Sequence, residues 1–277
     1  MSRLFVFGCS FTQYMWPTWA NIVAYDLQMP LYNFGFAGLG NVGIMHRVME
    51  ADMKFQFTPE DKIMIMWTSW SRDDYVQAHG MWAHAGSRYN QELNAKKIKQ
   101  LKTHWSPTDD IVKNSTAIAY VTKLYKDNIL WQGHGFDPWV DEGTDGDVKE
   151  LFLNEEDQQQ RYSQLLDFYK RKISKLPVRN LETGNLAFDY VRDSHPDVAE
   201  HIDVVQNYIY PCIDYTIRSE TIGIFASLHK SIKKVIMKKK LRDLHQVMHI
   251  PDGIIAQNYP EIHAYLDIRA LCDDISG

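Results

Sequence analysis

Short apolar runs alternate with segments of helical spacing over the first 67 residues of the chain. Residues 3–7, 30–34 and 61–67 are the apolar runs, and each has the length of a buried strand. Between them, residues 17–27 and 42–55 carry apolar side chains at the spacing of an amphipathic helix. The order strand, helix, strand, helix, strand with short loops predicts an α/β protein with a doubly wound parallel sheet.

The same pattern predicts where the chemistry lies. In a doubly wound sheet, ligands bind outside the carboxyl ends of the strands. The loops that follow Gly8, Phe34 and Trp67 meet at that edge. Functional side chains are therefore expected in these three loops.

Beyond residue 75 the regular alternation is lost. Residues 76–154 show no clean period, apart from a helix expected over 111–132, and we interpret them as a largely helical insertion or lid over the sheet. A further helix is expected over 155–176 and a strand over 186–191. From about 212 to 277 we expect a helical extension of the same single domain.

The composition limits the classes of function. A chain of 277 residues with 45% hydrophobic residues can bury a full core, and a formal net charge of −5 argues against a nucleic-acid partner. Three widely spaced cysteines without a CxxC pair predict neither a disulfide framework nor a zinc ribbon. No apolar stretch reaches the length of a membrane span, and the first eight residues are too short for a signal peptide, so we expect synthesis in the cytoplasm.

Ser10 lies just after the first expected strand, in the segment FGCSFT. Gly8 allows the backbone to turn sharply there. The segment fits a nucleophilic serine at the functional edge of the sheet. It also fits a plain strand-to-helix turn in which the serine caps a helix.

His195 lies far along the chain, in the segment DSHP, at the expected start of a helix. A hydroxyl nucleophile needs a base within hydrogen-bond reach, and the base needs an orienting partner. Asp193 can place its carboxylate near Nδ1 while Nε2 faces the serine. At a helix N-terminus the dipole would help to keep the imidazole neutral. The alternative is a helix-capping turn with an exposed histidine.

The segment NFGFAGLGN, residues 33–41, forms a glycine-rich loop after the second expected strand. Such a loop can turn backbone N–H groups toward a developing oxyanion. A flexible turn and a phosphate cradle are the alternatives. GxGxxG is absent in its proper order and GxxxxGK[ST] is absent altogether.

Together, FGCSFT, NFGFAGLGN and DSHP resemble the first, second and last sequence blocks of the SGNH (GDSL-like) hydrolases. With the downstream WTS…R, they particularly resemble SGNH-like proteins encoded by tailed phages. The resemblance covers residues 1–75 and about 189–210. It implies a flavodoxin-like three-layer α/β/α sandwich, with Ser10 as nucleophile, His195 as base and Asp193 as its partner.

The resemblance also implies an oxyanion hole made of the Ser10 and Gly38 N–H groups and an Asn side chain from the third block. That Asn is missing, because the segment after the third strand reads WTSWSRDD. Thr68, Ser69 or Asn41 could supply the third donor instead. Loss of one donor costs about a hundredfold or more in rate.

Two further departures concern the nucleophile and the base. The Asp of the first block is replaced by Cys9, whose thiol should point away from Ser10 by strand alternation. Asp193 and His195 are two residues apart, where the family has three, so the orienting contact comes from Asp193 or from another carboxylate.

The other polar residues receive structural or alternative assignments. Arg72 pairs with Asp73 or Asp74, or contacts an acidic group of a substrate. The histidines of the expected insertion form no HExxH or HxH pattern, so no metal site is predicted; they are His79, His84, His104 and His134. His201 is expected to be structural. The lysines of 230–240 form a solvated helix face or contact an anionic partner.

The leading hypothesis is a serine esterase that needs no cofactor and removes acyl groups, above all acetyl, from a carbohydrate or a small ester. The carbohydrate substrate comes from the resemblance and not from residue spacing. The main alternative is a non-catalytic SGNH-fold protein that binds partners or is built into a virion, with virion proteins as partners. A third hypothesis is a nucleotide-binding flavodoxin-like domain.

Overall fold

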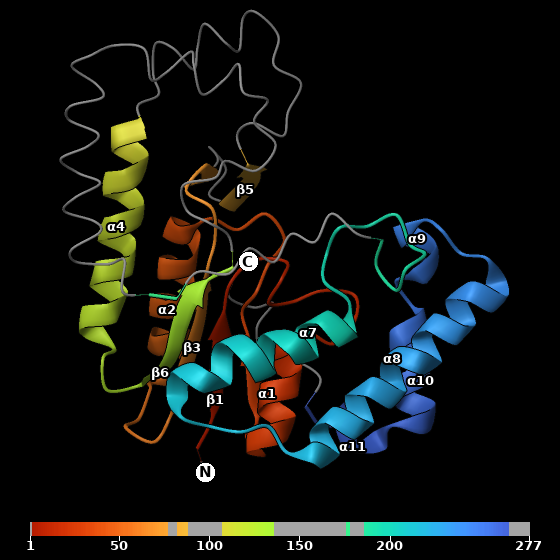
Figure 1. Ribbon diagram of the computed structural model, residues 1–277. Helices are drawn as coiled ribbons and strands as arrows, with labels where there is room; N and C mark the ends of the chain where they lie inside the picture. The colour runs from red at the N-terminus through yellow and green to blue at the C-terminus, as the bar shows by residue number, and fades with distance from the viewer. Residues whose placement is uncertain (1, 77–81, 88–106, 136–175, 178–185, 266–277) are drawn as a thin grey trace, which may run out of the picture.

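The centre of the protein is a four-stranded parallel sheet with the strand order β2-β1-β3-β6 (Figure 1). The computed structural model describes residues 2–76, 82–87, 107–135, 176–177 and 186–265. The sheet strands are β1 (Leu4–Phe7), β2 (Leu31–Asn33), β3 (Lys62–Trp67) and β6 (Ile129–His134). The predicted α/β class with a parallel sheet is confirmed.

Helices cover both faces of this sheet (Figure 1). In β1, Leu4 and Val6 point into the core shared with α1, α7 and α8, whereas Phe5 and Phe7 point into the core shared with α2 and α4. The predicted three-layer α/β/α arrangement is therefore present. The helices are α1 (Trp19–Leu27), α2 (Asn41–Phe55), α4 (Pro107–Leu124), α7 (Val198–Val204) and α8 (Ser219–Lys239).

The order of the strands reverses between β1 and β3. The unit β1–α1–β2 places β2 on one side of β1, and α2 then carries the chain to β3 on the other side. A reversal of this kind is the topological switch point at which open α/β sheets bind ligands. Ser10 follows β1 and Thr68 follows β3, so both lie at this point.

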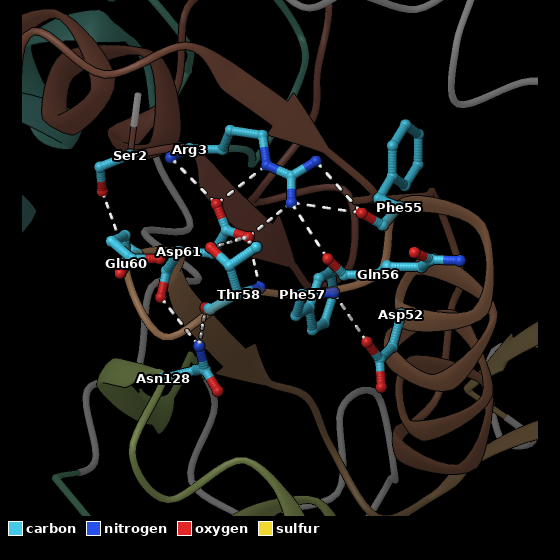
Figure 2. A network of polar contacts seen from close by, with 10 residues as sticks. All are labelled: Ser2, Arg3, Asp52, Phe55, Gln56, Phe57, Thr58, Glu60, Asp61 and Asn128. Carbon is cyan, nitrogen blue, oxygen red and sulfur yellow. Dashed lines mark hydrogen bonds and ion pairs between the residues drawn. The ribbon is translucent and has the colours of Figure 1, made fainter.

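The opposite end of the sheet is held by a buried ion pair. The Arg3 guanidinium donates to both carboxylate oxygens of Asp61 and to the Phe55 carbonyl (Figure 2). Burial would raise the pKa of Asp61, but hydrogen bonds from Arg3 and Thr58 outweigh it and lower the pKa to about 2. This network ties the starts of β1 and β3 together at the end away from the candidate site.

The predicted insertion 76–154 was wrong in part, because α4 and β6 belong to the sheet domain. The helix expected over 111–132 ends at Leu124, and β6 pairs with β3. The polar Gln132 is accommodated within β6 because its amide oxygen accepts hydrogen bonds from Trp67 and Thr122.

The start of this region is not helical. β4 (Arg72–Val76) and β5 (Trp82–Ser87) form an antiparallel pair. The rest of the predicted insertion, 77–81, 88–106 and 136–154, lies outside the described residues, as does nearly all of the helix predicted over 155–176.

The strand expected over 186–191 is a tight turn instead. Phe188 and Asp189 have φ values of 55° and 59°, and a single bridge joins Ala187 to Val191. This left-handed backbone cannot continue a strand.

Helices fill most of the described stretch after residue 197. A π-helical turn (Val205–Ile209) and a 3₁₀ turn (Tyr210–Ile213) follow α7. After α8 come α9 (Leu244–Val247), α10 (Ile250–Asn258) and α11 (Pro260–His263). No helix in the described ranges has both the length and the apolar character to cross a membrane.

Candidate active site

The structure brings Ser10, His195 and Asp193 together at the carboxyl edge of the sheet. Ser10 Oγ lies 2.9 Å from His195 Nε2, although the two residues are 185 positions apart in sequence. On the other side of the ring, His195 Nδ1 lies 2.7 Å from Asp193 Oδ1. A hydroxyl, an imidazole and a carboxylate in this order form the geometry of an activated nucleophile.

The Asp193 carboxylate determines which ring nitrogen of His195 carries the hydrogen. Burial would raise the pKa of Asp193, but hydrogen bonds from His195 and Tyr14 outweigh it and hold the pKa below its ordinary value. Asp193 is therefore ionised at neutral pH and can only accept hydrogen bonds. Nδ1–H donates to Asp193, which leaves Nε2 to accept the Ser10 hydroxyl.

The two-residue spacing of Asp193 and His195 closes a compact loop. Asp193 Oδ1 also accepts the backbone N–H of His195 at 2.7 Å. His195 does not start the helix as predicted. The N-cap of α7 is Asp197, whose carboxylate accepts the N–H groups of Ala199 and Glu200. The orientation of the imidazole therefore comes from Asp193, and the predicted helix-dipole contribution is not needed.

Close packing at Gly8 shapes the turn that carries Ser10. A Cβ atom at this position would lie 2.0 Å from Thr12 Oγ1 and 3.0 Å from the Met66 carbonyl oxygen. Only glycine fits there. Cys9 is fully buried in the core beneath α1, and its carbonyl accepts the Thr12 N–H, so its thiol is part of the core.

Three aromatic side chains that follow Ser10 contact the segment of His195, and the sequence analysis did not find them. The Tyr14 ring stacks on the imidazole at a centroid distance of 4.0 Å, and Phe11 meets it edge-on at 5.2 Å. The Trp16 indole N–H donates to the Pro196 carbonyl at 2.8 Å. The only sequence signal was the aromatic run itself, which has the composition of any core segment.

The glycine-rich loop lies against the turn of Ser10. The Phe36 N–H donates to the Gly8 carbonyl, and Gly38 takes a left-handed backbone with φ of 77°. Within the described part of the chain, neither the Ser10 N–H nor the Gly38 N–H has an acceptor. Neither N–H group is therefore committed to an internal hydrogen bond among the described residues.

The N–H groups that a phosphate cradle would use at the glycine-rich loop already have an internal acceptor. The Asp74 carboxylate accepts the N–H groups of Gly40 and Gly43 at 3.0 and 2.8 Å. These are the N–H groups at the start of α2 that an anionic ligand would need. An internal carboxylate already occupies that position.

The three predicted side-chain donors have different surroundings. Asn41 is buried, its amide hydrogens are donated to the Thr68 carbonyl and to Asn114, and its oxygen accepts the Thr68 N–H. Thr68 Oγ1 is buried and has no partner among the described residues. Ser69 Oγ lies 2.9 Å from Ser71 Oγ and accepts the Ser71 N–H. Asn41 thus fixes the loop after β3 and has no hydrogen left to donate.

Of the other predicted histidines, two lie outside the described ranges and two are buried. His79 and His104 are not among the described residues. His134 is buried at the end of β6, and burial lowers its pKa to about 4. His201 is fully buried in α7, and burial lowers its pKa to about 3. No cluster of three or more metal-binding side chains occurs within the described ranges.

The basic run lies on α8, where one lysine is ion-paired within the protein and others are exposed. Lys233 forms an ion pair with Asp189, whereas Lys230, Lys234 and Lys238 are exposed. The charges therefore face solvent on the outer side of the helix.

Comparisons with known proteins give distant likenesses only. No family model and no curated protein matches the chain. A member of the lipolytic protein G-D-S-L family from Veillonella parvula is similar at 14% identity and a TM-score of 0.38, over 75% of this chain and 98% of that one. A GDSL-like lipase from Bacteroides thetaiotaomicron has 14% identity and a TM-score of 0.34, over 74% and 83%. An acetyl xylan esterase from the rumen bacterium Butyrivibrio proteoclasticus has 12% identity and a TM-score of 0.36, over 77% and 63%.

Proposed function

We propose that the protein is a serine esterase of SGNH type that hydrolyses O-acetyl esters on a carbohydrate. The observation that supports this most is the line of contacts from Ser10 through His195 to Asp193, at 2.9 and 2.7 Å. Ser10 and His195 are 185 positions apart in sequence, and the fold brings them into hydrogen-bond contact.

In the first half of the proposed reaction, Ser10 Oγ attacks the ester carbonyl carbon while its proton passes to His195 Nε2. The negative charge that forms on the carbonyl oxygen is stabilised by the N–H groups of Ser10 and Gly38. The imidazolium, held by Asp193, then gives its proton to the departing alcohol as the carbon–oxygen bond breaks.

In the second half, water attacks the acyl group on Ser10. His195 takes a proton from this water and returns one to Ser10 Oγ, so that acetic acid leaves and the enzyme is regenerated. The missing Asn donor predicts a slower enzyme than one with three donors, by about a hundredfold. Of the three side chains proposed as substitutes, Thr68 is the one whose hydroxyl has no partner among the described residues. We therefore take the Thr68 hydroxyl as the candidate for the third donor.

The carbohydrate part of the proposal finds support in an exposed aromatic side chain of the glycine-rich loop. Phe36 is 47% exposed on the glycine-rich loop, and the Arg47 guanidinium lies 4.9 Å from its ring centroid. An exposed aromatic ring on the loop that contacts the turn of Ser10 offers a flat apolar surface to the face of a sugar.

The test is acetate release. We expect wild type to hydrolyse p-nitrophenyl acetate and an acetylated xylo-oligosaccharide, and we expect Ser10→Ala to lose about 10³-fold or more in kcat. Equal rates for the two proteins would refute a serine esterase. Cleavage of p-nitrophenyl acetate without any release from acetylated sugars would retain the esterase and refute its carbohydrate substrate.

One observation favours the alternative of a non-catalytic SGNH-fold protein that binds partners, such as virion proteins. Both Asn41 amide hydrogens are used within the protein, so this side chain does not replace the missing oxyanion donor. Under this alternative, wild type and Ser10→Ala would both be inactive on every acetyl ester, and both would bind the partner equally well.

A further inference from the structure

Asp193 has two carboxylate oxygens, and only one of them serves His195. Oδ1 accepts the backbone N–H and the Nδ1–H of His195. Oδ2 accepts the Tyr14 hydroxyl at 2.5 Å. The carboxylate is therefore held at both oxygens, at one by His195 and at the other by Tyr14, which is 179 positions from Asp193 in sequence.

Tyr14 contacts the base as well as the carboxylate. Its ring lies 4.0 Å from the imidazole by centroid distance, with 17° between the planes, and Phe11 closes the edge of the imidazole. A stacked ring prevents the imidazole from turning about its Cβ–Cγ bond. Together with the hydrogen bond to Asp193, this stacking keeps Nε2 facing Ser10.

The segment that bears Tyr14 is itself fixed. The Thr12 carbonyl accepts hydrogen bonds from Asn33 Nδ2 at 2.9 Å and from Thr18 Oγ1 at 2.6 Å. Beyond Tyr14, Trp16 donates to the Pro196 carbonyl. The loop that carries Ser10 therefore also carries the groups that hold His195 and Asp193.

We propose that Tyr14 is a positioning residue of this esterase, which holds Asp193 through its hydroxyl and His195 through its ring. The inference rests on the proposed function, since it assigns Tyr14 a role in that reaction. It explains how a two-residue spacing between Asp193 and His195 still yields an oriented base. Tyr14 exchanges no proton in the proposed reaction, so its effect must pass through Asp193 and His195.

The test is a double-mutant cycle read by the rate of Ser10 labelling with a fluorophosphonate. Tyr14→Phe keeps the ring and loses the hydroxyl, and we expect labelling to slow about tenfold. In an Asp193→Ala background, the same change should slow labelling no further, because the hydroxyl then has no carboxylate to hold. An equal effect in both backgrounds, or none in the first, would overturn the inference.

A matched control is available in the same chain. The Tyr125 hydroxyl donates to Asp52 Oδ2 at 3.0 Å, a tyrosine–carboxylate pair far from Ser10. Tyr125→Phe should leave the labelling rate unchanged. A similar slowing in this variant would show a general loss of stability and would overturn the inference.

A second variant and a spectroscopic measurement keep the inference testable if Tyr14→Phe is poorly folded. Tyr14→Leu removes ring and hydroxyl, and the folded fraction should label more slowly than Tyr14→Phe. The low-field proton resonance of His195 Nδ1–H should shift in Tyr14→Phe and stay in place in Tyr125→Phe. A resonance that does not move would contradict a contact through Asp193.

The two proposals fail in different ways. Absence of Ser10 labelling in wild type would overturn the esterase and the role of Tyr14 with it. Labelling in wild type at a rate that Tyr14→Phe leaves unchanged would overturn only the role of Tyr14.

Discussion

Asp193 Oδ1 accepts two hydrogen bonds from His195, one from its backbone N–H and one from its ring, each at 2.7 Å. The first bond fixes the turn between the two residues, and the second fixes the imidazole. One carboxylate oxygen thus sets both the backbone and the side chain of the proposed base.

Asp193→Asn tests this relationship. The asparagine oxygen can still accept one of these hydrogen bonds, but a neutral amide does not stabilise the imidazolium that forms in the reaction. We expect kcat on p-nitrophenyl acetate to fall roughly 10²–10⁴-fold with little change in KM.

Asp189→Asn is the control for this variant, because Asp189 lies four residues earlier, in the preceding turn, with a side chain that is 83% exposed. It should keep the wild-type rate. An Asp193→Asn enzyme as fast as wild type would remove Asp193 from the proposed reaction.

Gly8→Ala should destabilise the protein through overpacking. The added Cβ would lie 2.9 Å from Thr12 Cβ and 3.0 Å from the Met66 carbonyl oxygen, and neither belongs to a flexible chain end. We expect the free energy of unfolding in urea to fall by about 1–3 kcal/mol.

Gly253→Ala provides the comparison, because nothing lies within 4 Å of a Cβ at this position in α10. It should stabilise the protein by about 0.5–1 kcal/mol, since alanine is the better helix former. Equal effects of the two substitutions would show that the close approach at Gly8 is absent.

Asn41→Ala separates a structural role from a role in the oxyanion hole. The substitution leaves the buried N–H and carbonyl of Thr68 without their side-chain partner. We expect the free energy of unfolding to fall by at least about 2 kcal/mol, and kcat of the folded fraction to change less than about tenfold. A hundredfold loss of kcat at unchanged stability would instead make Asn41 an oxyanion donor.

The ion pair of Arg3 and Asp61 predicts a specific loss of stability in acid. The folded-state pKa of Asp61 is about 2, below its ordinary value of 3.8. A group with a lowered pKa stabilises the fold above its unfolded pKa, and that contribution disappears as the pH falls through the folded one. Between about pH 5 and pH 2, wild type should lose on the order of 2 kcal/mol more than Asp61→Asn. Parallel pH profiles for the two proteins would contradict this coupling.

The first half of the fold could be predicted because local pattern and tertiary environment agree there. β1 and β3 are buried on both faces, so they read as continuous apolar runs, and α2 lies between a glycine cap and Gln56 in a left-handed conformation. β6 could not be predicted because Gln132, Gly133 and His134 interrupt its apolar character. The Gln132 amide oxygen accepts hydrogen bonds from Trp67 on β3 and Thr122 on α4, and sequence spacing does not show these partners.

Prediction of the candidate site reached three residues that the structure brings together, and missed the side chains that contact them. Ser10, His195 and Asp193 are recognisable because they lie in short motifs in a fixed order. Tyr14 belongs to no motif, and its proposed positioning role depends on a hydrogen bond to Asp193, which is 179 positions away in sequence. For Asn41 the sequence suggested a donor to the substrate, but its buried amide forms hydrogen bonds with the Thr68 backbone instead. A sequence alone does not distinguish these two uses of an amide at the start of a helix.

The central claim is that the Ser10 hydroxyl is an activated nucleophile, and covalent labelling tests it most directly. After reaction with a fluorophosphonate, intact-mass and peptide analysis should find one phosphonyl group per wild-type chain, on Ser10. Ser10→Ala and His195→Ala, both folded, should remain unlabelled. Wild-type protein without the adduct, or with the adduct on another residue, would contradict the account.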